Sequence, residues 1–333
     1  MNSFPQSETN EYSDFIVRHN EKLNISKLAR LVGASYLILI LIPFLWADAL
    51  LLFLGRLGIS AEQMFSLLSD AAVLQVVQIV ISSVMFLLPF FIVIFGTGKK
   101  LGEIISFGAP DKKLFAPLVL MSIGFCAFAN IATNTVATFF SSLGFEYQSP
   151  QIEIPEGVFG FLLALLSTAV TPALVEEFAM RGIVLGALRK HGDGFAIIVS
   201  SLLFGLMHCN FMQIPFAFLV GLALAYSVIK TGSIWTGVVI HFINNLLSLC
   251  LDSLFKNIES VNLQSAITAI YFVLCLLCFF VGFLILCRKD DNRLELDNAD
   301  TALTLKEKIR TFFTHPLIII DIIATIIFSF ISM

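Results

Sequence analysis

The sequence predicts an all-α protein, a polytopic membrane helix bundle with eight core transmembrane helices. Hydrophobic residues make up 58% of the 333-residue chain and charged residues only 13%, with a mean hydropathy of +0.92. Soluble domains are about half apolar and a quarter charged, so this composition indicates an integral membrane protein. The apolar residues also fall in runs of about 20 or more, the length that spans a hydrocarbon core of about 30 Å.

Each predicted spanning helix is one of these apolar runs, bounded by polar or turn residues. Their length and period exclude a β-barrel, whose strands alternate over about ten residues. The first run is too long for the core of a secretory signal, so we expect an uncleaved spanning helix. The predicted helices cover residues 31–55, 71–97, 114–143, 158–189, 195–212, 214–230, 234–251 and 266–287.

The remaining segments complete a division of the chain into four parts. Residues 1–28 form a polar N-terminal tail, and residues 29–287 form the bundle, with a core of polar motifs at 158–251. Residues 288–310 form a charged linker. Residues 311–333 form a ninth apolar segment, which either spans the membrane or lies along its interface.

The distribution of basic residues predicts the orientation of the bundle. If the N-terminus is cytoplasmic, 18 of the 20 Lys and Arg fall in inside segments, and only Arg56 and Lys256 fall outside. Cytoplasmic loops of membrane proteins carry such an excess of Lys and Arg. We therefore expect a multi-pass protein of a bacterial cell membrane with its N-terminus in the cytoplasm. The bilayer, and not nucleic acid, is the expected surrounding partner.

Three charged residues interrupt the fourth apolar run. Glu176 and Glu177 are adjacent, and Arg181 follows one helical turn later. Each charge at mid-bilayer depth costs roughly 2.5–3.5 kcal/mol on insertion scales. The sum, about 9 kcal/mol, is comparable to the stability of a whole domain, about 5–15 kcal/mol. The cluster therefore predicts a functional site whose partners lie on neighbouring helices.

Two further polar pairs lie in later helices. Phe204 precedes His208 by four residues, and His241 precedes Asn245 by four, so each pair shares a helix face. Counting 1.5 Å per residue puts Glu176 and His208 both roughly 20 Å from the cytoplasmic turn between their helices. We expect these polar groups to converge in one layer that is open to the cytoplasmic side. A bend in the long fourth helix would make Glu176 shallower.

These motifs together resemble a known family. The order Glu-Glu-x-x-x-Arg at 176–181, Phe-x-x-x-His at 204–208 and His-x-x-x-Asn at 241–245 is similar to the CPBP family, the CaaX-protease and bacteriocin-processing group of intramembrane endopeptidases. The resemblance covers roughly residues 158–251. It implies a CaaX-type peptidase that hydrolyses a peptide bond in a membrane-associated or lipidated substrate.

The resemblance and the chemistry of peptide hydrolysis assign a role to each residue. Hydrolysis needs an activated water, donors for the oxyanion and a proton for the leaving amine. Glu176 is the candidate general base, with His208 helping to hold the water. His241 and Asn245 are candidates for the oxyanion site. Three residues are expected to support them: Glu177 and Arg181 as an ion pair, and Phe204 packed against the imidazole.

A metal-dependent mechanism is the alternative use of the same residues. Glu176, His208 and His241 resemble a zinc ligand set that leaves a fourth position open. The sequence lacks His-Glu-x-x-His, and we favour the metal-free mechanism while a divalent ion such as Zn²⁺ stays open. The Cys275-x-x-Cys278 pair lies in an uncharged apolar run without a second such pair, and predicts buried thiols rather than a metal site.

Other function classes also place polar groups within a membrane. A proton- or ion-coupled transporter would do so, although its broken helices usually occur in both halves of an inverted repeat. A non-catalytic bacteriocin-immunity or scaffold protein could use the same fold, because fold alone does not fix function. The Glu177–Arg181 pair could be purely structural, and His241 with Asn245 could serve as an interhelical hydrogen bond.

Overall fold

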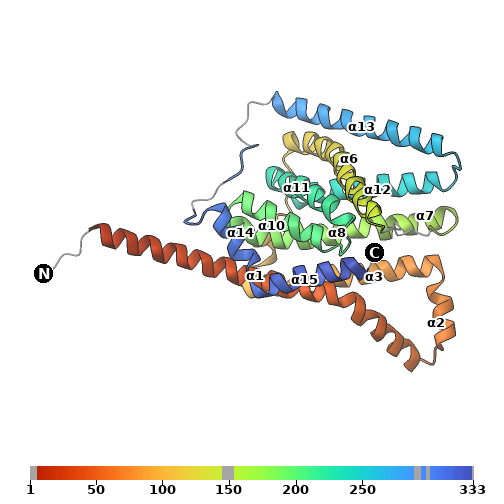
Figure 1. Cartoon of the computed structure of the whole chain (residues 1–333), viewed down its shortest axis with the longest axis horizontal. Helices are drawn as coiled ribbons and strands as arrows, with labels where there is room; N and C mark the ends of the chain where they lie inside the picture. Colours follow the sequence, from red (N-terminus) through yellow and green to blue (C-terminus); the bar gives the residue numbers. More distant parts are fainter. Residues whose placement is uncertain (1–5, 145–153, 289–293, 298–300, 332–333) are drawn as a thin grey trace.

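The computed structural model describes residues 6–144, 154–288, 294–297 and 301–331 (Figure 1). These residues form helices joined by turns and contain no strand, so the all-α prediction is confirmed. Three short elements are not α-helical: η1 and η2 are π-helical turns, and η3 is a 3₁₀ turn. The elements are α1 (Gln6–Arg56), α2 (Ala61–Leu68), α3 (Ala71–Leu87), α4 (Phe91–Thr97), α5 (Leu101–Ile104), α6 (Lys112–Ser142), α7 (Gly157–Leu165), η1 (Leu166–Val170), α8 (Thr171–Glu177), η2 (Phe178–Val184), α9 (Leu185–Leu188), η3 (Arg189–His191), α10 (Asp193–Leu206), α11 (Gln213–Thr231), α12 (Ile234–Phe255), α13 (Val261–Cys287), α14 (Leu305–Phe313) and α15 (Pro316–Ile331).

The described part of the chain contains seven helices that are long and apolar enough to cross a membrane. An eighth crossing results if the bent pair α14 and α15 forms one span. The predicted polytopic bundle is therefore confirmed, but two of the predicted helices differ from the observed ones. The fifth predicted span, 195–212, is a helix of only 14 residues, Asp193–Leu206. At 1.5 Å per residue it is about 21 Å long, too short to cross the hydrocarbon core upright.

Helix α1 extends well beyond the predicted first span. It contains 51 residues, which corresponds to roughly 77 Å. Its C-terminal part contains the predicted span 31–55, and its polar N-terminal part projects from the bundle at the left of Figure 1. The polar segment is thus helical from Gln6 onward.

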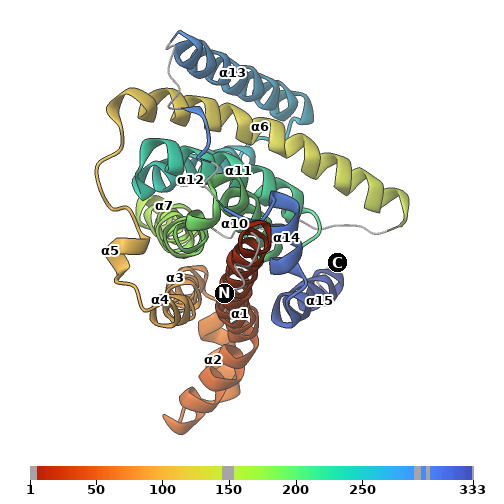
Figure 2. The ribbon, with the colours of Figure 1, turned by 90° about the vertical axis from the view of Figure 1, so that its left-hand side faces the viewer.

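The helices stack in layers, with the segment from α7 to α12 in the middle. Figure 2 shows α13 and α6 as the outer layer on one side and α1 with α15 on the opposite side. Helices α6 and α13 approach so closely that a Cβ on Gly124 would overlap the Cys275 carbonyl. Close backbone approach through small residues is the usual way in which helices associate in lipid. The middle layer is therefore enclosed from both sides.

The loops at one end of the bundle are joined by hydrogen bonds. Asp111 N donates to Thr231 O over 2.9 Å, and Ile234 N donates to Ser106 O over 3.0 Å. Most of the Lys and Arg lie at this end, and we call it the basic end. Because the loops satisfy one another's backbone groups there, the ends of α6, α11 and α12 are held in register.

The linker before α14 is attached to the same end. Asp193 and Asp297 exchange two hydrogen bonds, Asp193 N to Asp297 O at 3.0 Å and Asp297 N to Asp193 Oδ2 at 3.1 Å. Arg189 pairs with Asp193 at 2.9 Å, and buried Glu21 of α1 accepts from Leu303 N at 2.9 Å. These contacts fix α14 against α1. Helix α15 then turns away from α14 by 71°.

The chain from Gly157 to His191 is one long helix with two π-helical turns in it. A π turn fits one extra residue into a helical turn and is frequent at functional sites. The first occupies Leu166–Val170, and the second occupies Phe178–Val184. Helix α8, which carries both adjacent carboxylates, lies between them. A bend was considered for this helix because of its length. The two π-helical turns are the places where its regular geometry changes.

Candidate active site

The chain reverses direction between α10 and α11 inside the bundle. Cys209 lies in this turn with φ 46°, a left-handed conformation that non-glycine residues seldom adopt. Two buried carbonyls at the end of α10 accept side-chain donors: His208 Nδ1 donates to Phe204 O at 2.9 Å, and the Tyr36 hydroxyl donates to Leu203 O at 3.2 Å. Irregular backbone is tolerated at membrane depth where protein encloses it or where it lines a cavity. The short α10 thus ends close to His208.

Glu177 and Arg181 form a completely buried ion pair. Glu177 Oε1 lies 2.8 Å from Arg181 Nη1, and neither side chain is exposed. The same Oε1 accepts from His241 Nδ1 at 3.0 Å, which links α8 to α12. Arg181 Nη2 also donates to Gly221 O on α11 at 3.4 Å. Among the described residues, Glu177 Oε2 and Arg181 Nε are buried without a hydrogen-bond partner, so the pair is compensated through Oε1, the atom that also orients the imidazole.

Phe204 packs at the centre of the cationic and imidazole side chains. The Arg181 guanidinium carbon lies 4.0 Å from the centre of its ring, a cation–π contact. The rings of His208 and His241 meet Phe204 edge to face at centroid distances of 5.3 and 5.9 Å. Phe204 was predicted to pack against the His208 imidazole, and its ring does so in the structure. Its ring also contacts His241, which the sequence did not indicate.

Glu176 and Asn245 lie on either side of His241. Glu176 Oε2 lies 4.0 Å from His241 Nε2, and its side chain is 14% exposed. Asn245 Nδ2 donates to Thr168 O in η1 at 3.1 Å, and Asn245 Oδ1 accepts from Asn244 Nδ2 at 3.2 Å. Because the His241 Nδ1 faces Glu177, the Nε2 edge of this ring is directed toward Glu176.

The four candidate catalytic side chains line one cavity of about 340 Å³. Its wall comes from α3, η1, α8, the end of α10 and its turn, α11 and α12. Besides the predicted residues, the wall includes polar side chains that sequence reasoning missed: Gln78, Thr168, Gln213, Asn244, Ser248 and Asp252. The structure thus brings Glu176, His208, His241 and Asn245 together around one polar space, while Glu177 and Arg181 lie behind it.

The lining of this cavity shows the direction in which it extends. On α12 its lining begins at His241 and continues through Ser248 to Asp252, near the end of the helix at Phe255. Helix α12 starts at the basic end, so this lining runs away from it. The polar layer was expected to open toward the cytoplasmic side. That expectation rested on depth alone, which does not tell on which side of His241 the helices separate, and the end that faces the cytoplasm stays a prediction.

A second cavity adjoins the first at His208. It measures about 330 Å³ and is lined mainly by apolar side chains of α1, α3, the turn after α10 and α15, including Leu39, Met85, Met207 and Phe328. His208 is the residue that both cavities share. The imidazole is therefore part of a wall between a polar and an apolar space.

The donor atoms do not fit a metal ion as they are arranged. Within the described ranges, no three His, Cys, Asp or Glu side chains come close enough together to hold one. Zinc needs three or four ligands at about 2.0–2.3 Å from one point. We therefore derive no step through a metal at this site.

Residues 158–247 match the family model for type II CAAX prenyl endopeptidase Rce1-like proteins. This segment, under a third of the chain, is similar to that family. No curated protein and no solved structure matches the chain. The Rce1-like segment runs from α7 into α12 and contains all three polar motifs, so the family resemblance predicted from them is confirmed. The cavity residues from α3, and α1 and α15 around the apolar cavity, lie outside the matched segment.

Gly237, one turn before His241, allows α12 to approach the buried ion pair of the Rce1-like segment. A Cβ at this position would lie only 2.6 Å from Glu177 Oε2 and 2.9 Å from Val228 Cγ2. We expect Gly237→Ala to lower the free energy of unfolding by about 1–3 kcal/mol, the usual cost of overpacking. Chemical denaturation of the purified protein in detergent would measure this change. Gly55→Ala, where a Cβ meets nothing within 4 Å, is the matched control and should not lose stability. Equal stability of both variants would contradict the close packing.

Proposed function

We propose that this protein is an intramembrane endopeptidase that hydrolyses a peptide bond in a membrane-associated or lipidated substrate. One observation carries the proposal: Glu176, His208, His241 and Asn245 line a single polar cavity inside an otherwise apolar bundle. The Rce1-like match over residues 158–247 supports a peptidase of the CAAX type at family level. Ionisable groups within a membrane bundle are costly and are usually retained for function.

Glu176 is the proposed general base. It takes a proton from a water molecule while the water oxygen attacks the carbonyl carbon of the scissile bond, and the carbonyl π electrons move to oxygen. When the C–N bond breaks, Glu176 returns the proton to the leaving amine nitrogen. His208 supports this step because its Nδ1–H is donated to Phe204 O, which leaves the Nε2 lone pair to accept from the water.

His241 and Asn245 are the proposed donors to the oxyanion. The Nδ1 contact with Glu177 leaves the Nε2 edge of His241 for the developing charge, when both ring nitrogens carry protons. Asn245 has two amide protons, and the Thr168 carbonyl accepts only one of them. Donors placed in advance at the oxyanion contribute more in an apolar site than in water.

The two charges behind the cavity form a neutral pair, because Glu177 and Arg181 lie 2.8 Å apart. Net neutrality matters because isolated charges are strongly disfavoured where the dielectric is low. We infer that Arg181, held over Phe204, acts on the chemistry only through Glu177.

The apolar cavity beside His208 supports a substrate with an apolar chain near its scissile bond. A side chain or lipid that filled this space would leave the adjoining peptide at the polar wall. We further infer from the positive-inside pattern that the basic end faces the cytoplasm of the cell.

The test is cleavage by the purified full-length protein of matched peptides with and without a prenyl or acyl chain. We expect cleavage at one bond near the lipid attachment site, a preference for the lipidated member of each pair, and no loss of activity with a metal chelator. Product masses identify the bond. No cleavage of any membrane-bound or lipidated peptide would remove the peptidase assignment. Loss of activity with chelator, restored by Zn²⁺, would replace the metal-free mechanism with a metal-dependent one.

A further inference from the structure

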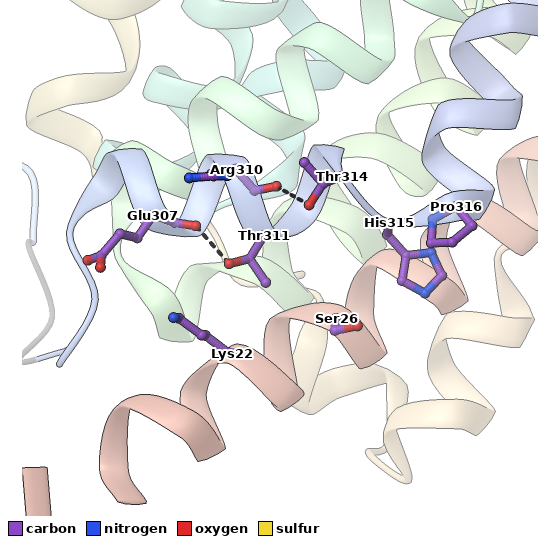
Figure 3. A pocket seen from close by; sticks show the side chains of 8 residues that line it. All are labelled: Lys22, Ser26, Glu307, Arg310, Thr311, Thr314, His315 and Pro316. Carbon is purple, nitrogen blue, oxygen red and sulfur yellow. Dashed lines mark hydrogen bonds between the residues drawn. The ribbon is translucent and has the colours of Figure 1, made fainter. Parts of the chain in front are cut away.

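A second polar pocket lies at the basic end, far from the candidate active site. It has a volume of about 420 Å³ and lies between α1 and the bend that joins α14 to α15. Figure 3 shows Lys22 on α1 with Glu307 and Arg310 of α14 toward one end of the pocket, and Thr314, His315 and Pro316 toward the other end. None of these residues belongs to the Rce1-like match at 158–247. The mechanism proposed above does not use them.

The pocket has an excess of positive charge. Lys22 and Arg310 approach it from the two facing helices and are both exposed. Neither forms an ion pair with a carboxylate in the described part of the chain, although Glu307 lies close enough to Lys22 to attract it electrostatically. Two cations on opposite walls of an open cavity are arranged to receive an anion between them.

Glu307, the acidic residue of the pocket, is engaged elsewhere. Its Oε1 pairs with Arg18 at 2.6 Å, and its Oε2 accepts from the backbone N and the hydroxyl of Thr304, both at 2.9 Å. In Figure 3 its carboxylate lies at the opposite end of the pocket from His315. Because its charge is balanced by Arg18 and by the start of α14, it leaves the excess charge of Lys22 and Arg310 in place.

His315 adds a directed donor. Its Nδ1 accepts from Leu317 N at 3.3 Å, so the proton of the neutral ring lies on Nε2. The Nε2–H group is then available to an acceptor in the pocket. The hydroxyl protons of Thr311 and Thr314 are donated to carbonyls of their own helix, Glu307 O and Arg310 O, so these two groups offer no donor to an anion.

The pocket lies where the apolar part of the molecule begins. The apolar run of α1 starts near Leu31, two turns after Lys22, and the apolar helix α15 starts at Pro316. The polar helix α14 meets α15 at 71°, as expected where one helix follows the interface and the next enters the hydrocarbon. Basic pockets at this level lie beside the headgroups of the lipids.

We propose that this pocket binds a phosphate group, held between Lys22 and Arg310, with His315 Nε2–H at the other end of the pocket. The level of the pocket favours a phospholipid headgroup as the source of the phosphate, and a soluble phosphate ester offers the same chemistry. This inference is independent of the proposed peptidase activity. It concerns a separate site on parts of the chain outside the matched segment.

The test is binding of short-chain lipids to the full-length protein in detergent. The probes are dioctanoyl phosphatidic acid, dioctanoyl phosphatidylcholine, glycerol phosphate and inorganic phosphate, and native mass spectrometry or calorimetry measures affinity. We expect phosphatidic acid to bind at least about tenfold more tightly than phosphatidylcholine. The double variant Lys22→Gln/Arg310→Gln should weaken this binding about 30-fold, from the loss of two interfacial cations. Retention by wild type of phosphatidic acid but not glycerol phosphate would identify a lipid, and equal binding of both would identify a soluble phosphate ester.

A matched control uses the same two helices. Lys27→Gln/Lys306→Gln removes two exposed cations from α1 and α14 that do not line the pocket. It should bind phosphatidic acid within about twofold of wild type, and size-exclusion profiles should show that both variants remain folded. If the two double variants lose affinity equally, bulk charge explains the binding and the pocket does not. Unchanged binding by Lys22→Gln/Arg310→Gln would also overturn the proposal.

Discussion

Glu176→Gln is expected to lower peptide turnover by at least about 100-fold, because general-base catalysis typically contributes 10²–10⁴ to rate. The amide keeps the size of the carboxyl but cannot take the proton of the attacking water. The side chain faces the cavity, and its one ion-pair contact is the 4.0 Å approach to His241. We therefore expect the fold and the thermal unfolding temperature to remain close to those of wild type. Turnover of a lipidated peptide, measured by product mass, checks the prediction.

The control for this change is Glu156→Gln. Glu156 precedes α7, at the far end of the same long helix, and is exposed outside the cavity. It should retain turnover within about twofold of wild type, the range expected for a surface change. Full turnover by Glu176→Gln would remove Glu176 as the base. If the cellular function survived that substitution without any peptide cleavage, a non-catalytic partner protein or a transporter would be the better hypothesis.

Arg181→Met is expected to cost about 3–5 kcal/mol of unfolding free energy, because it leaves the buried Glu177 carboxylate without its cation. The pair is closed at 2.8 Å with neither side chain exposed. The double variant Glu177→Gln/Arg181→Met should recover most of that stability, since no buried charge remains uncompensated. Both variants should lose turnover, because Glu177 no longer orients His241 as it does at 3.0 Å. Urea denaturation in detergent and peptide turnover measure the two effects separately.

Arg18→Met provides the comparison with an exposed ion pair. Arg18 and Glu307 are about one-third exposed and lie 2.6 Å apart. Exposed pairs contribute about 0–1 kcal/mol, so this variant should be much milder than Arg181→Met. Equal losses in the two variants would show that the Glu177–Arg181 pair does not depend on its burial. A double variant no more stable than Arg181→Met would show that the uncompensated carboxylate is not the cause.

Hydropathy was sufficient to predict most of the fold, because a helix that crosses lipid must be apolar along its length. Hydropathy did not predict the helix boundaries that depend on polar contacts or on turn geometry. The start of α1 is polar, and its helix carries Arg18 and Glu21, which bond the linker at 302–307. The apolar run after α10 continues past Leu206, yet the chain turns there with Cys209 in the left-handed region, which no residue propensity predicts.

The candidate site was predictable from spacing because residues four apart share a helix face, and matching depths brought three helices to one level. The role of Gly237 was not predictable. A single glycine in a helix does not indicate a close contact until the structure places α12 beside Glu177. Asn244 and Thr168 were also not predicted as cavity residues, because isolated polar residues of these types are common in helices. Gly237 precedes His241 by four residues and therefore shares its helix face. This spacing was the one signal in the sequence that could have indicated that another helix packs closely against that face.

The direction of the polar cavity bears on the side of the membrane from which water and substrate reach the site. Its lining follows α12 from His241 toward Asp252, away from the end where the basic residues gather. With that end in the cytoplasm, solvent would reach Glu176 from the extracytoplasmic compartment, and cleaved peptide would depart into it. An anchored substrate would then approach through the outer leaflet, and the proposed phosphate pocket at Lys22 would face the inner one.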